Sequence, residues 1–271
     1  MTVDQKDSVK KYFSDTSEDY NAAYDANRQT LRSYVFSLRK QHVFNLINLK
    51  AGGRVLDVGC GPGVFAEELL KSGYEVWGID ISEEMVKLAE RKMQEKGIRG
   101  IFHFNTGDIE SIDFPDKYFD FVLCVGVLEY LKEDSRALNE VRRVLKDGGK
   151  AIFTVPNIAS PFSLLERLSV IILKFIFRIL KVCGINVKKP QESLLFRSDL
   201  HDRYYLPWRF NRKLLKSGLK IEQGIFHLYR IAFMNAVSPS LTLFFTRKLE
   251  FLSKTPFYWM GINYIVMVSK D

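Results

Sequence analysis

The chain has 271 residues, 46% of them hydrophobic and 27% charged, which is enough for one large domain with an elaborated cap. Its three cysteines form no Cys-x-x-Cys pair, which argues against a disulfide framework and against a zinc site. The polar N-terminus has no signal-peptide pattern, and there is no uncharged apolar run of about 18 residues. We therefore expect a cytoplasmic protein that does not span a membrane.

The net charge of +8 is unevenly distributed along the chain. Residues 1–150 contain 22 Lys and Arg against 25 Asp and Glu, whereas residues 151–271 contain 18 against 7. A basic C-terminal part suits an acidic partner, such as an anionic membrane surface, a phosphate-bearing substrate or nucleic acid. A solvated basic face would explain the same counts, so both interpretations stay open.

Two helices are predicted at the N-terminus, over residues 9–24 and 29–49. The first has an aromatic side formed by Tyr12, Phe13, Tyr20 and Tyr24. Such a side either packs on a sheet or faces a ligand.

The chain is organised around a strand, a glycine turn and a helix, predicted at 55–58, at Gly59, Gly61 and Gly63, and at 64–71. Glycines let the backbone turn tightly and approach a ligand closely. This arrangement is typical of the first crossover of a nucleotide-binding α/β sheet, with the ligand beyond the carboxyl end of the strand. A dinucleotide fingerprint needs its third glycine at position 64, which is Val. Because Asp57 would also repel a pyrophosphate but suit a cation, an NAD oxidoreductase is disfavoured.

Strands and helices alternate through most of the remaining chain, which predicts an α/β fold. The predicted strands are 74–82, 101–109, 121–131, 151–155, 219–226 and 262–268. The predicted helices run from Ser82, their N-cap, to 96, and over 134–145, 162–181 and 208–217, with a further apolar stretch at 241–251. We expect Gly148 and Gly149 to stop the helix over 134–145.

Several motifs together resemble a known family. Asp57 to Gly63 (Asp-Val-Gly-Cys-Gly-Pro-Gly) resembles motif I of the class I S-adenosylmethionine-dependent methyltransferases. Phe119 to Val122 resembles the start of motif IV, and Leu145 to Gly149, with the strand up to Asn157, resembles motif VI. The motifs keep the family order, and the chain is similar to ubiquinone-biosynthesis-like methyltransferases of the small-molecule type.

The resemblance implies a Rossmann-like seven-stranded sheet, mostly parallel with an antiparallel last strand and helices on both faces. It divides the chain into an N-terminal helical lid (1–49), a cofactor-binding core (50–157), a helical cap inserted before strand six (158–215) and the last two strands with an extra cap helix (216–271). The implied cofactor is S-adenosylmethionine, which leaves as S-adenosylhomocysteine.

The resemblance also implies roles for individual residues around the cofactor. Asp80 would bind the ribose diol, Asp108 the adenine amino group, and the lid tyrosines would exclude water near the sulfonium. The predicted cofactor-binding residues are Tyr12, Tyr20, Asp57, Gly59, Cys60, Gly61, Gly63, Asp80, Ile81, Met85, Asp108, Ile109, Cys124 and Val125.

The loop after the fourth strand bears on the methyl acceptor. It reads Cys-Val-Gly-Val and offers no amide or acid to hold a nucleobase, which weighs against nucleic acid as the substrate. The family's usual Leu-Glu-His is replaced by Leu128-Glu129-Tyr130. We take Tyr130 and His201 as candidates for acid–base help, and Tyr24, Glu129, Tyr204 and Tyr205 as candidates for contact with the acceptor. No metal-binding cluster is expected, so we predict metal-independent transfer by proximity and orientation.

Many members of the family have a short connection before strand six, whereas this chain has a predicted helix over 162–181. Arg167, Lys174, Arg178 and Lys181 share one helical face, and the remaining side chains are bulky and apolar. This pattern suits peripheral contact of residues 163–182 with an anionic membrane, on its inner face. A pocket wall, a dimer seam and plain core packing are alternatives, and the oligomeric state is open.

The sequence therefore predicts an enzyme that methylates a small, lipophilic or lipid-linked acceptor, preferably at oxygen. A nucleic-acid methyltransferase and a non-catalytic cofactor-binding protein at a membrane surface are the alternatives.

Overall fold

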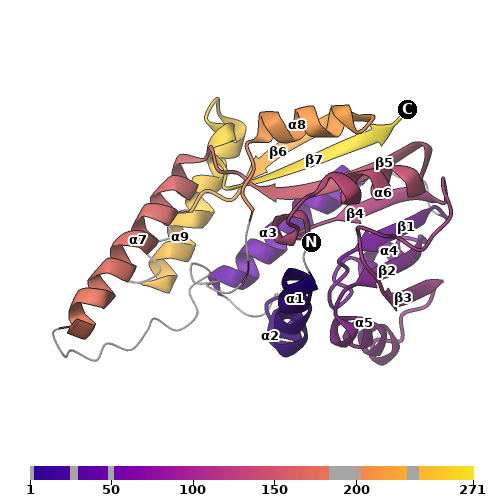
Figure 1. Cartoon of the computed structure of the whole chain (residues 1–271), viewed down its shortest axis with the longest axis horizontal. Helices are drawn as coiled ribbons and strands as arrows, with labels where there is room; N and C mark the ends of the chain where they lie inside the picture. The colour runs from indigo at the N-terminus through magenta and orange to yellow at the C-terminus, as the bar shows by residue number, and fades with distance from the viewer. Residues whose placement is uncertain (1–2, 25–29, 48–51, 183–199, 201–202, 231–237) are drawn as a thin grey trace.

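A seven-stranded sheet with helices on both faces forms the body of the protein (Figure 1). The structure is a computed structural model that describes residues 3–24, 30–47, 52–182, 200, 203–230 and 238–271. The strands are β1 (Arg54–Val58), β2 (Glu75–Asp80), β3 (Phe102–Thr106), β4 (Phe119–Cys124), β5 (Leu145–Pro156), β6 (Leu219–His227) and β7 (Asn263–Lys270). The α-helices are α1 (Val3–Asp15), α2 (Ser17–Ala22), α3 (Leu31–Leu46), α4 (Ala66–Lys71), α5 (Glu83–Glu95), α6 (Ser135–Val144), α7 (Pro161–Val182), α8 (Pro207–Lys216) and α9 (Pro239–Leu249).

The strand order is β3-β2-β1-β4-β5-β7-β6. Strands β1 to β5 are parallel, and β7 runs antiparallel to both β5 and β6. This confirms the predicted fold class. The order reverses between β1 and β4, and ligands of open α/β sheets bind beyond the carboxyl ends of the strands at such a reversal.

Hydrophobic side chains fill the core on both faces of the sheet. In β1, Leu56 and Val58 belong to the same buried cluster as Leu138 of α6, whereas Val55 packs with Leu69 of α4 on the other face. A strand buried on both faces has little room for polar side chains, which explains its continuous apolar sequence. Asp57, 1% exposed, is the fully buried charged residue of β1, whose other charged residue, Arg54, is half-buried at the start of the strand.

Several predicted helix boundaries differ from the structure, and two of the differences have a local cause. The first helix is broken at Thr16, whose φ of −113° and ψ of 13° lie outside the helical region, so the segment forms α1 and α2. The predicted glycine stop is wrong: α6 ends at Val144, and Leu145 is already extended. Because Leu145 pairs with Phe119 of β4, the chain enters β5 directly, and Gly148 lies where the register of that pairing shifts.

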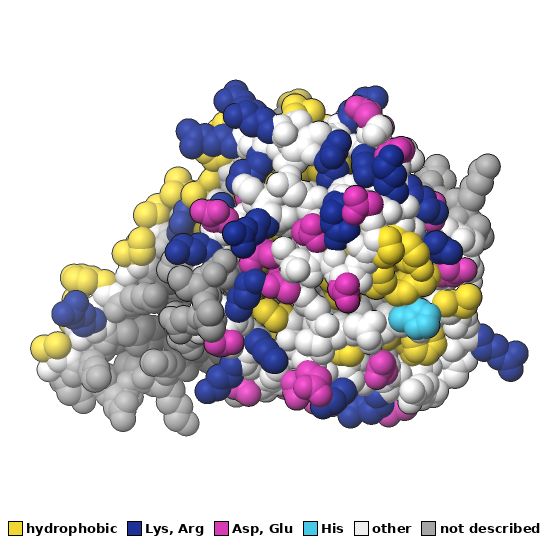
Figure 2. Space-filling view, turned by 45° about the vertical axis from the view of Figure 1, so that its right-hand side comes forward, with side chains coloured by type: hydrophobic (Ala, Val, Ile, Leu, Met, Phe, Trp, Pro, Cys, Tyr) yellow, Lys and Arg dark blue, Asp and Glu magenta, His cyan; other side chains and the backbone are white. Residues whose placement is uncertain are grey.

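Helices α7 and α9 extend away from the sheet as an arm (Figure 1). Figure 2 shows hydrophobic side chains along the outer edge of this arm, whereas Lys, Arg, Asp and Glu are interspersed over the body. Within the described parts of the chain, no helix combines the length and the apolar character needed to cross a membrane.

Candidate functional site

A pocket that is partly open to solvent lies at the carboxyl ends of β1, β2 and β4. Among the predicted cofactor and acceptor residues, those that line it are Tyr20, Tyr24, Gly59, Cys60, Gly61, Asp80, Ile81, Met85, Asp108, Ile109, Val125 and Tyr130. The pocket therefore collects residues from the glycine turn, from the ends of neighbouring strands and from the N-terminal helices.

The glycine turn forms the floor of this first pocket. Gly59 has φ +68°, and a Cβ built there would lie 2.3 Å from Cγ2 of Val127. Only glycine fits both the left-handed backbone and this close approach. Gly63 does not line the pocket; a Cβ there would lie 3.1 Å from Cβ of Ala89, so Gly63 lets the turn pack on α5.

Asp80 connects the glycine turn to the start of α5. Its Oδ2 accepts a hydrogen bond from the Gly61 N–H (2.9 Å), and its Oδ1 accepts one from the Ser82 N–H (2.9 Å). Burial raises the pKa of Asp80, although these backbone hydrogen bonds oppose the shift. The Ile81 backbone is a third partner, and a carboxylate has about four lone-pair positions, so capacity remains for a further donor such as a ribose hydroxyl.

Asp57 lies behind the pocket lining rather than in it. Its Oδ2 is buried and has no hydrogen-bond partner among the described residues. Burial and the nearby charge of Asp80 raise the pKa of Asp57 to about 7. A cation in the pocket would favour the ionised carboxylate, so the pair suits a positively charged ligand such as a sulfonium.

Asp108, the third acid, is already engaged by the lid. Its Oδ1 accepts from the Glu110 N–H (2.9 Å), and its Oδ2 pairs with Lys6 of α1. Lys6 also lies 2.9 Å from Glu110 Oε2. The predicted first helix began at residue 9, so the sequence interpretation did not include this contact.

The N-terminal helices cover the pocket and are held there by polar contacts. Gln5 donates to the Tyr130 carbonyl (2.9 Å), and Ser14 donates to Glu84 of α5 (2.9 Å). The Tyr20 ring lies 3.8 Å from where a Cβ on Gly61 would be. Tyr12, predicted to contact the cofactor, does not line the pocket; its neighbour Phe13 does, because one residue turns a helix by about 100°.

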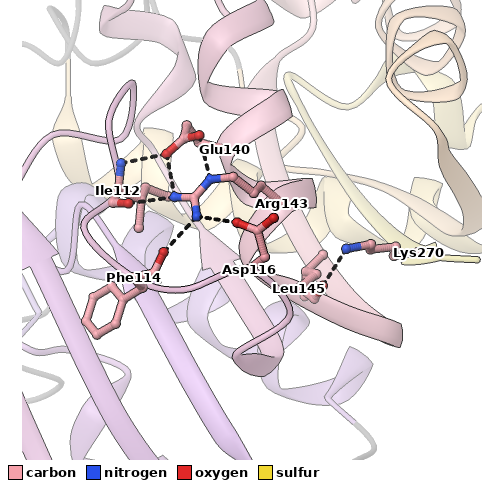
Figure 3. Close-up of polar contacts among 7 residues, drawn as sticks. All are labelled: Ile112, Phe114, Asp116, Glu140, Arg143, Leu145 and Lys270. Atoms are coloured by element: carbon pink, nitrogen blue, oxygen red, sulfur yellow. Dashed lines mark hydrogen bonds and ion pairs between the residues drawn. The ribbon is translucent and has the colours of Figure 1, made fainter.

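The loop after β3, which carries Asp108, is fixed from outside the pocket by Arg143 of α6 (Figure 3). Arg143 donates to the carbonyls of Ile112 and Phe114 (both 2.7 Å) and to both carboxylate oxygens of Glu140 (both 2.8 Å). Glu140 in turn accepts from the Ile112 N–H (2.8 Å). Lys270 of β7 donates to the Leu145 carbonyl beside this network.

A second pocket adjoins the first and shares Tyr20, Gly126 and Tyr130 with it. Among the predicted acceptor residues, Glu129 and Tyr204 line the second pocket, whereas Tyr24 lines the first. Its wall also contains residues that the sequence interpretation missed: Val35, Phe36, Arg39, Pro156, Ser163, Arg167, Leu228, Arg230, Ile262 and Asn263. These residues come from distant segments, and no local motif marks them.

Two predicted site residues lie in the core instead. Tyr205 is 7% exposed, does not line either pocket, and donates its hydroxyl hydrogen bond to the Leu128 carbonyl (3.0 Å). Cys124 is fully buried in β4, and Val125, Gly126 and Val127 form the pocket wall in its place. His201 lies outside the described residues.

The first pocket also has lining residues that were not predicted. Val9, Phe13, Pro62, Phe65 and Gly107 are among them. Pro62 lies inside the glycine turn, and Gly107 directly precedes Asp108. Both could therefore have been predicted to line the pocket from their position next to the motifs. Across the part of the chain that the structure describes, no His, Cys, Asp and Glu side chains gather in a way that could hold a metal ion.

Comparison with known sequences agrees with the geometry of the first pocket. Residues 56–153 match the family described as Methyltransferase domain. The chain is 35% identical over 117 residues to the uncharacterized methyltransferase YdaC of Bacillus subtilis, covering 42% of this chain and 62% of that protein. It is 30% identical over 194 residues to the ubiquinone biosynthesis O-methyltransferase of Xanthomonas euvesicatoria, covering 68% of this chain and 79% of that protein.

Comparison with solved structures supports the fold over nearly the whole chain. Magnesium protoporphyrin IX methyltransferase from Synechocystis, solved with bound SAH, superposes with a TM-score of 0.61 at 19% identity. The superposition covers 98% of this chain and 100% of that chain.

Proposed function

The chain belongs to the class I S-adenosylmethionine-dependent methyltransferases, and on this premise we propose that it transfers a methyl group to a small, lipophilic or lipid-linked acceptor, preferably at oxygen. The observation that carries the proposal is the pair of adjoining pockets that meet at Tyr20, Gly126 and Tyr130. The first has the acids and the glycine turn for the cofactor. The second has room for an acceptor, with both apolar and charged side chains on its wall.

The residues of the first pocket can hold S-adenosylmethionine. The remaining acceptor capacity of Asp80 fits a ribose hydroxyl, and the buried acids fit a cation. When bound, the cofactor supplies a methyl group on a positively charged sulfur. Tyr20 and Phe13 cover the pocket and would exclude water, and aromatic faces also favour a cation.

Orientation of the acceptor is the main contribution that we assign to the second pocket. Two reactants held in line react as if at very high local concentration, so no strong base is required for a phenol or carboxylate acceptor. Tyr130 lines both pockets and Glu129 lines the second, so they are the candidates for orienting or deprotonating a hydroxyl. His201 stays a candidate from the sequence alone.

Calorimetry with S-adenosylhomocysteine tests the cofactor part of the proposal. We expect the wild type to bind and Asp80→Ala to bind at least about 100-fold more weakly, since two backbone contacts and the ribose partner are lost. Asp113→Ala, an exposed acid in the loop after β3, is the matched control and should bind like the wild type. Absence of binding to the wild type, or equal binding to Asp80→Ala, would contradict the assignment.

The acceptor is identified by incubating the protein with cofactor labelled on the methyl group and with fractionated cell extract. We expect the labelled methyl group to be recovered in the organic phase, because a lipophilic product partitions there. Label recovered only in nucleic acid would support the alternative substrate, which the Cys-Val-Gly-Val loop disfavours.

We also propose that residues 163–182 contact an anionic membrane. Exposed apolar side chains follow one stripe of α7, at Leu164, Leu168, Ile171, Phe175 and Ile179. Arg167 and Arg178 on the same helix are exposed, which suits anionic lipid. Ile171→Asp with Phe175→Asp should abolish flotation with vesicles containing phosphatidylglycerol while leaving S-adenosylhomocysteine binding unchanged. Equal flotation of wild type and variant would refute this contact.

A further inference from the structure

Helix α8 presents cations to solvent that no acid in its own segment neutralises. The stretch 203–221 contains six Lys and Arg and no Asp or Glu. Two of the six lie within ion-pair distance of the buried Asp134. Three others are exposed on α8 and have no ion pair among the residues that the structure describes: Arg209, Arg212 and Lys216. Their charge is therefore available to an anionic partner.

The exposed face of α8 also has two large apolar side chains. Trp208 is 59% exposed and Leu215 is 56% exposed. Residues four and seven positions apart share one face of a helix, so Trp208, Arg212 and Leu215 form a single row. Phe210 and Leu214, by contrast, are buried against the protein. The helix thus offers aromatic, aliphatic and cationic groups side by side.

Contacts with the body of the protein fix α8 in place beside β6 (Figure 1). Tyr264 of β7 donates its hydroxyl hydrogen bond to Asn211 Oδ1 at 3.1 Å. The Phe210 ring packs edge to face with Tyr205, at 5.1 Å between centroids, and with Phe153 of β5, at 6.3 Å. The exposed face is therefore already formed before any partner binds.

The mixture of groups on this face favours a lipid surface over nucleic acid. Both are anionic, and both attract Lys and Arg. Tryptophan prefers the interfacial layer of a bilayer, and a leucine beside it gains from burial in lipid but not from a phosphate backbone. The helix also begins three residues after Tyr204, whose ring centroid lies 4.4 Å from the guanidinium carbon of Arg167 on α7. It therefore starts close to the helix whose membrane contact is proposed above.

We infer that the exposed face of α8 is a second docking surface, for an anionic phospholipid bilayer, formed by Trp208, Arg209, Arg212, Leu215 and Lys216. The three cations attract lipid phosphates, and the two apolar side chains enter the interfacial layer. This surface goes beyond the contact proposed for α7, since it uses different residues and needs neither cofactor nor acceptor. Two separate contacts also fix how the protein is oriented on the bilayer.

Tryptophan fluorescence tests the docking directly. The chain has three tryptophans, and Trp77 is only 9% exposed, so Trp259→Phe leaves Trp208 as the one exposed tryptophan. This variant is mixed with vesicles of phosphatidylglycerol and of phosphatidylcholine, each with and without bromine on the acyl chains. We expect brominated phosphatidylglycerol to quench the emission and brominated phosphatidylcholine to leave it unchanged. Adding Trp208→Phe should abolish the quenching.

Charge variants measure the contribution of the cations. The test variant combines Arg209→Gln, Arg212→Gln and Lys216→Gln. The matched control removes the same charge from exposed positions on other elements: Lys10→Gln, Lys11→Gln and Arg99→Gln. In vesicle sedimentation we expect the test variant to bind phosphatidylglycerol at least about 10-fold more weakly than the wild type, and the control to bind like the wild type. Equal weakening in both would mean that net charge alone matters and would overturn the inference.

The outcomes separate this inference from the other proposals. Vesicle binding by the wild type without quenching of Trp208 overturns the α8 surface and leaves the α7 contact standing. Tighter binding of an RNA oligonucleotide than of vesicles, lost in the test variant, assigns the face to nucleic acid and also overturns it. S-adenosylhomocysteine affinity is measured on every sample and reports folding. A wild type that binds vesicles but not S-adenosylhomocysteine contradicts the proposed methyl transfer alone.

Discussion

The two adjoining pockets share three residues but are built in opposite ways. The first lies over the ends of adjacent strands and combines buried acids, Asp57 and Asp80, with a glycine turn. The second is lined by arginines from α3, α7 and the segment after β6. The contrast is between a site built from a short stretch of sequence and adjacent strand ends, and a wall assembled from segments that are far apart in the chain.

Of the substitutions considered, Gly59→Ala should have the largest effect on the stability of the protein and on ligand binding in the first pocket. The substitution strains a left-handed backbone and forces Val127 aside, so we expect about 3 kcal/mol loss of unfolding free energy. S-adenosylhomocysteine affinity should fall by at least about 100-fold, measured by calorimetry. Gly97→Ala is the matched control: its φ of +58° imposes the same strain, but a Cβ there meets no atom within 4 Å. Equal affinity losses in the two variants would contradict the steric explanation.

Arg143→Met tests whether the first pocket depends on support from outside it. Loss of the donors to Ile112, Phe114 and Glu140 should lower the free energy of unfolding by about 2 kcal/mol in urea titrations. The neighbouring Arg142→Met, which loses one long contact of 3.3 Å to Gly218, should change it by less than about 0.5 kcal/mol. Similar losses in both variants would mean that the network does not hold the loop.

Asp57→Asn tests the buried acids of the first pocket through the pH dependence of the free energy of unfolding. The folded-state pKa of Asp57 is raised to about 7 by burial and by Asp80. Its favourable contribution is complete below the ordinary carboxyl pKa and is lost as the pH rises through 7, because the folded protein must then ionise a buried group. Asn stays neutral, so at pH 8 the ligand-free variant should be more stable than the wild type by about 2 kcal/mol.

Urea unfolding at pH 4 and pH 8 measures this difference. The stability advantage of Asp57→Asn should shrink toward zero at pH 4, where the wild-type carboxyl is protonated in the folded state and about half protonated in the unfolded state. At pH 8 the same variant should bind the cationic cofactor more weakly than the wild type, since it cannot supply a negative charge. An advantage that is constant with pH would show that Asp57 does not titrate in this range.

Lys6→Met should have the smallest effect, because it removes a half-exposed ion pair between the lid and Asp108. We expect S-adenosylhomocysteine to dissociate about threefold to fivefold faster, measured by stopped-flow fluorescence. Lys10→Met, an exposed lysine of the same helix, is the control and should leave the rate unchanged. A slower dissociation from Lys6→Met would instead mean that Lys6 competes with the adenine for Asp108.

Local sequence patterns were sufficient for the sheet and for most of the first pocket. A short, mostly apolar run such as Val55 to Val58, followed by glycines, is typical of a buried strand, and the glycine spacing after it favours the turn that follows. Ser82 was correctly predicted to cap α5, where its side chain accepts from the Met85 N–H. Phe13 lines the first pocket in place of the predicted Tyr12, because neighbouring residues of a helix point about 100° apart.

The acceptor pocket was beyond the reach of such patterns. Arg39 and Arg230 are separated by most of the chain, and each alone is compatible with a solvated surface. Tyr205, expected at the acceptor, is instead held in the core by its hydrogen bond to Leu128. The spacing of the motifs and the periodicity of the strands were enough to predict the fold class and the first pocket. Both depend largely on residues that are close together in the sequence. Only the tertiary structure decided which charges are buried together, since burial depends on how distant segments pack.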